Sequence, residues 1–129
     1  MVAPNMKYTE FYADADGESH FRDVEVEVTL ADIAPPADPM NASEFRPAKQ
    51  AGFITLPPGW AGGWHTAPSV GHIFVLSGEM EVEVSDGERR RFSKGSVWLH
   101  TDLTGKGHDT RVVSKDGAVL AMVKMADAG

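Results

Sequence analysis

Residues 57–78 read PPGWAGGWHTAPSVGHIFVLSG, and residues 94–108 read KGSVWLHTDLTGKGH. These segments flank a hairpin pattern near the middle of the chain and hold four of its 5 histidines. Imidazole is the commonest protein metal ligand, and its charge changes near neutral pH. The two segments therefore predict where the functional site lies.

The first segment resembles the first motif of the cupin superfamily, a group of small β-barrels with a pocket inside. Gly59 is followed by five residues and then by His65, and the segment closes at Gly78. The second histidine of the family motif falls on Ala67, and its glutamate falls on Gly71. Two of the three ligand positions in this motif are therefore empty.

The second segment resembles the second cupin motif from Gly95 to His108, although its spacing is two residues longer and the proline is missing. The run Thr104–His108 is similar to that of a subgroup of small single-domain cupins. The resemblance implies an all-β fold, the double-stranded β-helix or jelly-roll barrel. It implies one cupin domain over residues 1–129, with N-terminal strands and a Pro-rich arm in 1–48 and the barrel core in 49–125. It also implies a homodimer, for which the arm is a natural swapped element.

The hydrophobic pattern predicts β-strands independently of this resemblance. Residues 24–28 and 81–84 alternate apolar and charged side chains, as half-buried strands do. Asp86-Gly87 and Asp116-Gly117 are typical hairpin turns. Three prolines between residues 34 and 39 predict that this stretch is an extended arm, over the barrel or across a partner subunit. Further strands are expected over residues 52–56, 72–76, 90–92, 95–100, 110–114 and 118–125.

The Asp86-Gly87 hairpin allows a prediction of register. A plain two-residue loop would place arginines on the apolar face, so we expect one extra residue with Gly87 in the left-handed conformation. This bulged turn would pair Val82 with Phe92 and Glu83 with Arg91.

Composition excludes several classes of function. The chain has 129 residues, a net charge of -7 and no cysteine, which excludes a disulfide scaffold and Cys-ligated zinc. The one basic cluster, residues 89–91, faces glutamates across the hairpin, so we expect ion pairs there and no nucleic-acid binding. No stretch approaches the ~20 apolar residues that span a bilayer. These features predict a cytoplasmic protein that does not bind membranes.

The resemblance also indicates which histidines could bind a metal. Metal-binding cupins use three histidines and one glutamate, and only His65 and His108 carry over from that arrangement. Strand parity turns His72 away from the pocket unless a bulge at Gly71 shifts the alternation. With such a bulge, His65, His72 and His108 would bind a divalent transition metal (Fe, Ni, Zn or Mn).

Other side chains of the two segments are candidates for the ligand pocket. Trp60 and Trp64 lie in a Gly-rich loop, where large rings often cover a pocket opening. His100 is either a pocket base or ligand, or a histidine hydrogen-bonded at a strand end. The expected ligand pocket therefore contains Trp60, Trp64, His65, His100 and His108. Asp102 is most simply a turn residue.

Three functions remain open at this stage. The favoured one is a small-molecule-binding cupin with a His-lined barrel pocket and a weak or relocated divalent-metal site. The alternative is a metal-dependent cupin enzyme, dioxygenase- or isomerase-like, acting on a small organic substrate. The third is a metal-free epimerase-like enzyme with a pocket histidine as general base. No catalytic residue can be identified from the sequence, and whether the protein is an enzyme stays open.

Overall fold

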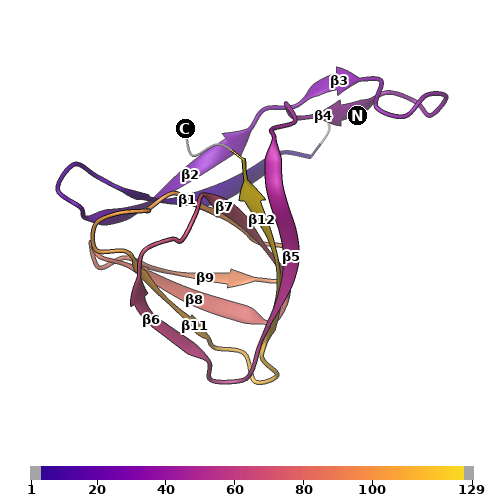
Figure 1. Ribbon diagram of the computed structural model, residues 1–129. Coiled ribbons are helices and arrows are strands. Elements are labelled where there is room, and N and C mark those ends of the chain that lie inside the picture. Colours follow the sequence, from indigo (N-terminus) through magenta and orange to yellow (C-terminus); the bar gives the residue numbers. More distant parts are fainter. Residues whose placement is uncertain (1–3, 127–129) are drawn as a thin grey trace.

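The structure, a computed structural model, describes residues 4–126, and all regular elements in this range are strands (Figure 1). Within these residues no helix is long and apolar enough to cross a membrane. The strands are β1 (Met6–Ala13), β2 (Ser19–Val26), β3 (Thr29–Ala31), β4 (Met40–Ala42), β5 (Ala48–Leu56), β6 (Ala61–His65), β7 (Gly71–Ser77), β8 (Glu79–Val84), β9 (Arg89–Ser93), β10 (Val97–His100), β11 (His108–Val112) and β12 (Ala118–Met125).

Two sheets form the barrel. One has six strands in the order β2-β1-β10-β7-β12-β5, and the other has four in the order β6-β11-β8-β9. From β5 to β12 every connection except β8–β9 crosses from one sheet to the other, which is jelly-roll topology. β1 and β10 run parallel, whereas the other paired strands are antiparallel. The predicted all-β jelly-roll fold is confirmed.

The core lies between the two sheets and follows the period-two pattern of the sequence. On β8, Met80, Val82 and Val84 are buried, while the intervening glutamates are partly exposed. Phe11 is fully buried at the centre, with its ring stacked on that of Trp98 at a centroid distance of 5.3 Å. Aromatic rings from β1, β9 and β10 thus fill the space between the sheets.

The β8–β9 hairpin has a different register from the predicted one. Val84 and Glu88 flank a three-residue loop in which Gly87 is left-handed, with φ of 98°. Phe92 therefore pairs with Met80, and Arg90 pairs with Val82. The predicted pairing of Val82 with Phe92 is wrong because β9 is an edge strand: Arg90 opposite Val82 leans out over the sheet edge and does not enter the core.

The predicted charge pairing across this hairpin is confirmed. Arg91 contacts Glu79 at 3.1 Å and Glu81 at 3.4 Å, and Arg89 contacts Glu83 at 3.3 Å. The neighbouring strand therefore neutralises Arg89 and Arg91, whereas Arg90 pairs with Asp23 and Glu88.

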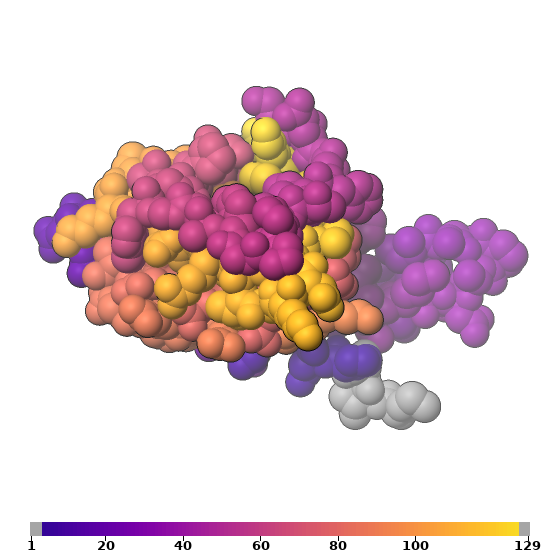
Figure 2. All heavy atoms as spheres, turned by 90° about the horizontal axis from the view of Figure 1, so that it is seen from below, coloured from indigo at the N-terminus to yellow at the C-terminus, as the bar shows by residue number. Residues whose placement is uncertain are grey.

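Residues 29–47 form a projecting arm. β3 and β4 pair only with each other and extend well beyond the barrel, as Figures 1 and 2 show from two directions. Residues 43–46 then return along the outer face of the six-stranded sheet to β5. The expectation of an arm is met, with a small hairpin at its end.

Candidate functional site

Three of the motif histidines come together at one end of the barrel. His65 ends β6 and pairs directly with His108, which begins β11. Their ring centroids are 4.7 Å apart, and the ring of His100, at the end of β10, stacks on His108 at 6.3 Å. His65 is exposed, whereas His108 and His100 are buried. The three rings therefore lead from solvent into the barrel.

Asp102 lies beneath this cluster and is the functional candidate that the sequence interpretation missed. Its side chain is fully buried, and Oδ2 accepts a hydrogen bond of 2.5 Å from Nδ1 of His108. Because an ionised carboxylate only accepts, this bond fixes a proton on Nδ1 and leaves Nε2 of the neutral ring as an acceptor. Oδ1 has no partner among the described residues. The six-residue separation of Asp102 and His108 across the turn was the only signal in the sequence.

The ring of His65 is oriented in a similar way. Its Nδ1 donates a hydrogen bond of 2.7 Å to the carbonyl oxygen of Gly63. In both His65 and His108, Nδ1 is therefore bonded to a protein acceptor, and Nε2 has no such bond in the described residues.

His100 occupies space that Gly71 leaves free. A Cβ atom on Gly71 would lie 3.1 Å from Nε2 of His100 and 3.2 Å from the methyl carbon of Met122. Nε2 of His100 has no hydrogen-bond partner among the described residues. Burial, followed by the proximity of His108, lowers the pKa of His100 from 6.5 to about 4. His100 is therefore a neutral, buried ring with a free nitrogen.

A cavity of about 560 Å³ adjoins this cluster along β5 and β12. Met122 lines it and also approaches Gly71, the glycine that faces His100. The other lining residues are Gln50, Ala51, Gly52, Phe53, Ile54 and Lys124.

Comparison with known proteins identifies the fold. No protein-family model and no curated protein matches the chain. Among solved structures, it resembles the Cnp3 cupin domain of Schizosaccharomyces pombe, with a TM-score of 0.50 and 14% identity over 98% of this chain and 86% of that one. This chain folds as a cupin.

Two bacterial cupins are similar over much of the chain. The cupin 2 conserved barrel protein of Salinispora arenicola CNS-205 has a TM-score of 0.49 and 18% identity, covering 80% of this chain and 78% of its own. An RmlC-like cupin of Shewanella frigidimarina NCIMB 400 has a TM-score of 0.47 and 17% identity, covering 92% and 85%.

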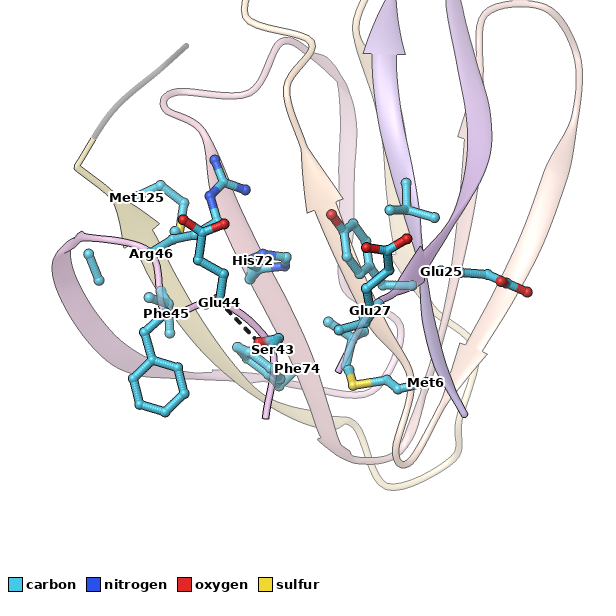
Figure 3. Close-up of a pocket in the computed structure, with 16 residues that line it drawn as sticks. Met6, Glu25, Glu27, Ser43, Glu44, Phe45, Arg46, His72, Phe74 and Met125 are labelled. Atoms are coloured by element: carbon cyan, nitrogen blue, oxygen red, sulfur yellow. Dashed lines mark hydrogen bonds between the residues drawn. The ribbon is translucent and has the colours of Figure 1, made fainter. Parts of the chain in front are cut away.

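His72 lies on the opposite face of this cupin's six-stranded sheet. The pairing of β7 with β10 continues regularly through Gly71, opposite His100, and His72, opposite Leu99. Because Gly71 faces His100 in the interior, His72 faces outward, where its ring lies 5.1 Å from that of Tyr8 (Figure 3). The expected set of His65, His72 and His108 is therefore not brought together, since no bulge occurs at Gly71.

The tryptophans also lie outside the expected pocket opening. Trp60 folds over Gly62 and packs against the core, and Trp98 is buried within it. Trp64 is opposite Asp109, so strand alternation turns its half-exposed ring away from His65.

The donor set matches only part of a cupin metal site. Two imidazoles on one ion, at metal–nitrogen distances of about 2.1 Å, place their ring centres roughly 4.5–5.2 Å apart, and the 4.7 Å between His65 and His108 agrees. Ala67 and Gly71 supply no ligand, and among residues 4–126 no group of three His, Cys, Asp or Glu side chains could hold a metal ion. The residues do not fit the site of three histidines and one glutamate that the fold family implies.

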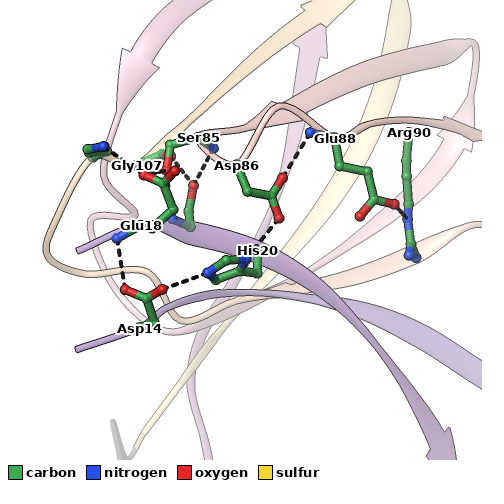
Figure 4. A network of polar contacts seen from close by, with 10 residues as sticks. Asp14, Glu18, His20, Ser85, Asp86, Glu88, Arg90 and Gly107 are labelled. Carbon is green, nitrogen blue, oxygen red and sulfur yellow. Dashed lines mark hydrogen bonds and ion pairs between the residues drawn. The ribbon is translucent and has the colours of Figure 1, made fainter. Parts of the chain in front are cut away.

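The fifth histidine belongs to a separate network at the turns (Figure 4). Nε2 of His20 lies 2.7 Å from Asp14, and Nδ1 lies 2.8 Å from Asp86. The hydrogen bonds to these two carboxylates raise the pKa of His20. His20 therefore ties the β1–β2 turn to the β8–β9 turn and does not join the other histidines.

Proposed function

We propose that this protein is a small-molecule-binding cupin whose ligand contacts the cluster of His65, His100 and His108 in the barrel. The main observation behind this proposal is the buried hydrogen bond between His108 and Asp102, which lies beside the unpartnered Nε2 of His100. Burying an unpaired polar atom costs free energy that an apolar core would avoid. A ligand that satisfies these atoms accounts for their presence.

The arrangement of protons favours one kind of ligand. His65 and His108 each direct Nδ1–H to a protein acceptor, so their Nε2 atoms accept in the neutral state. The buried Asp102 carboxylate adds negative charge beneath them. These groups favour a neutral, hydroxyl-bearing molecule over an anionic one, because an anion would meet acceptors and a carboxylate.

The proposal includes a weak divalent-metal site. His65 and His108 are spaced as two ligands of one ion, and two imidazoles bind transition metals only weakly without further protein ligands. A metal-dependent dioxygenase or isomerase remains the alternative, and it requires a third ligand beside this pair. We also propose that the protein is cytoplasmic, comprises one cupin domain over residues 1–129 and acts as a homodimer.

The test combines ligand screening with metal analysis. We would screen a library of small neutral hydroxyl compounds and matched carboxylates by NMR against the wild type, His108→Gln and the control His20→Gln. The proposal predicts neutral hits that disappear in His108→Gln and persist in His20→Gln. A screen with no hit that depends on His108 would contradict it.

Elemental mass spectrometry would test the alternative. Near-stoichiometric metal in the wild type that is lost in His65→Ala would support the metal-dependent enzyme in place of the metal-poor binding protein.

A further inference from the structure

A second cavity, of about 310 Å³, lies at the end of the six-stranded sheet where β5 begins and β12 ends (Figure 1). Its walls come from these two strands, from the β6–β7 loop and from the turn that follows β10. Among residues 4–126, neither a histidine nor a carboxylate lines it. This cavity is therefore separate from the histidine cluster and has a different chemistry.

Two lysines bring positive charge to the cavity wall. Lys124 on β12 pairs with Gln50 on β5, and Lys49 is the preceding residue on β5. Within residues 4–126 neither lysine takes part in a salt bridge, whereas Lys106 is paired with Glu18 at 2.7 Å. In a chain with 19 acidic and 12 basic residues, two lysines with no carboxylate along the same wall leave a local positive charge, which an anion would neutralise.

The hydroxyl of Ser69 adds a hydrogen-bond donor to the same cavity. Its Oγ atom is buried and has no hydrogen-bond partner among the described residues. Backbone bonds hold the loop around it: the amide of Met125 donates to the carbonyl oxygen of Val70 at 2.9 Å. The amide of Ala67 donates to the carbonyl oxygen of Asp102 at 3.0 Å. Burying a hydroxyl without a partner costs free energy, and a ligand oxygen in the cavity would offset that cost.

The chemistry of the lining favours an organic phosphate. Lysine ammonium groups bind phosphate as point charges, and a phosphate monoester carries more negative charge near neutral pH than a carboxylate does. Much of the remaining lining is apolar, with side chains such as Pro68, Val70 and Leu103. Apolar side chains beside a few polar groups suit a ligand that carries a hydrocarbon part next to its phosphate.

We propose that this cavity binds the phosphate group of a small organic molecule, with Lys49, Lys124 and Ser69 as its contacts. The two ammonium groups neutralise the phosphate charge, and the Ser69 hydroxyl donates a hydrogen bond to one of its oxygens. Gln50 and Lys124 also line the cavity of about 560 Å³ beside the histidine cluster. The phosphate site is therefore next to the ligand site of the proposed function, but it does not depend on it.

NMR titration tests this site with three probes: phenyl phosphate, inorganic phosphate and phenol. With phenyl phosphate we expect saturable amide shifts at residues 69–70 and 124–125, with a weaker response to inorganic phosphate and none to phenol. Lys49→Gln and Lys124→Gln should each raise the Kd for phenyl phosphate about fivefold, which is the upper range for an ion pair open to solvent. The control Lys94→Gln, which changes an exposed turn residue, should leave that Kd unchanged.

Ser69→Ala separates a binding role from a structural one. Because Oγ of Ser69 has no partner in the described chain, this variant should retain or gain unfolding free energy while it binds phenyl phosphate about tenfold more weakly. His108→Gln should bind phenyl phosphate as the wild type does, so this site and the histidine cluster are tested separately. The inference would be overturned by shifts that lie outside the cavity, by lysine variants that behave like Lys94→Gln, or by equal Kd values for phenyl phosphate and inorganic phosphate.

Discussion

Replacement of His100 by glutamine should remove much of the pH dependence of folding stability. His100 is 6% exposed, and its pKa in the folded protein is about 4 against 6.5 for the free side chain. The unfolded chain therefore takes up a proton below pH 6.5, whereas the folded protein takes it up only near pH 4. Stability contributed by the neutral ring is complete above pH 6.5 and is lost as the pH falls toward 4.

The magnitude follows from the same two pKa values. Their difference corresponds to about 3 kcal/mol over the full range, at 1.36 kcal/mol for each tenfold change in proton affinity. Between pH 8 and pH 5 the wild type should lose roughly 2 kcal/mol of unfolding free energy through this group. In His100→Gln this part of the loss should be absent.

Urea unfolding at pH 8 and pH 5, with a chelator present, measures this difference. Trp64→Phe, which replaces an exposed side chain without a titratable group next to the cluster, is the matched control and should retain the wild-type pH dependence. If His100→Gln and the wild type lose the same free energy between the two pH values, the buried neutral state of His100 is refuted.

Three further outcomes are expected. NMR titration should give His20 a pKa above 6.5. The stability that protonated His20 contributes should be present below pH 6.5 and lost as the pH rises through its pKa in the folded protein. A pKa of His20 at or below 6.5 would contradict the ion-pair network. Gly71→Ala should lower the unfolding free energy by roughly 1–3 kcal/mol, because the added Cβ would press on the His100 ring. Urea unfolding at pH 8 measures this loss, and an unchanged stability would contradict the close contact. Asp102→Asn should cost roughly 1–3 kcal/mol in the same assay and shift the His108 ring resonances, whereas an unperturbed His108 spectrum would contradict the hydrogen bond.

The fold could be predicted because its signals are local and repeated. The alternation of residues 81–84 and the turns at Asp86-Gly87 and Asp116-Gly117 define strands without knowledge of their partners. The register of the β8–β9 hairpin could not be predicted in the same way. It depends on Arg90 reaching Asp23 at 2.7 Å across the sheet edge, a contact between residues far apart in the chain.

The site was predicted in part for a similar reason. The motif spacing identified His65 and His108, which pair with each other in the structure. The regular alternation of side chains along β7 explains why His72 lies on the outer face of the sheet. Asp102 resembled an ordinary turn residue, because its burial arises only when the turn folds back over the barrel. The His100 ring fits because Gly71, on the neighbouring strand, has no side chain. This contact joins residues on two strands, so no pattern along the sequence indicates it.

The parallel pairing of β1 with β10 has a consequence for biosynthesis. Thr9 aligns with Trp98 and Phe11 with His100, so the first strand, which pairs early with β2, gains its second neighbour only after most of the chain has left the ribosome. β12 must then enter between β7 and β5 to complete the same sheet. Until that moment the nascent chain exposes strand edges and the apolar residues of the core, and such non-local topologies fold slowly. The protein should therefore depend on chaperone protection during synthesis more than a helical domain of equal length does.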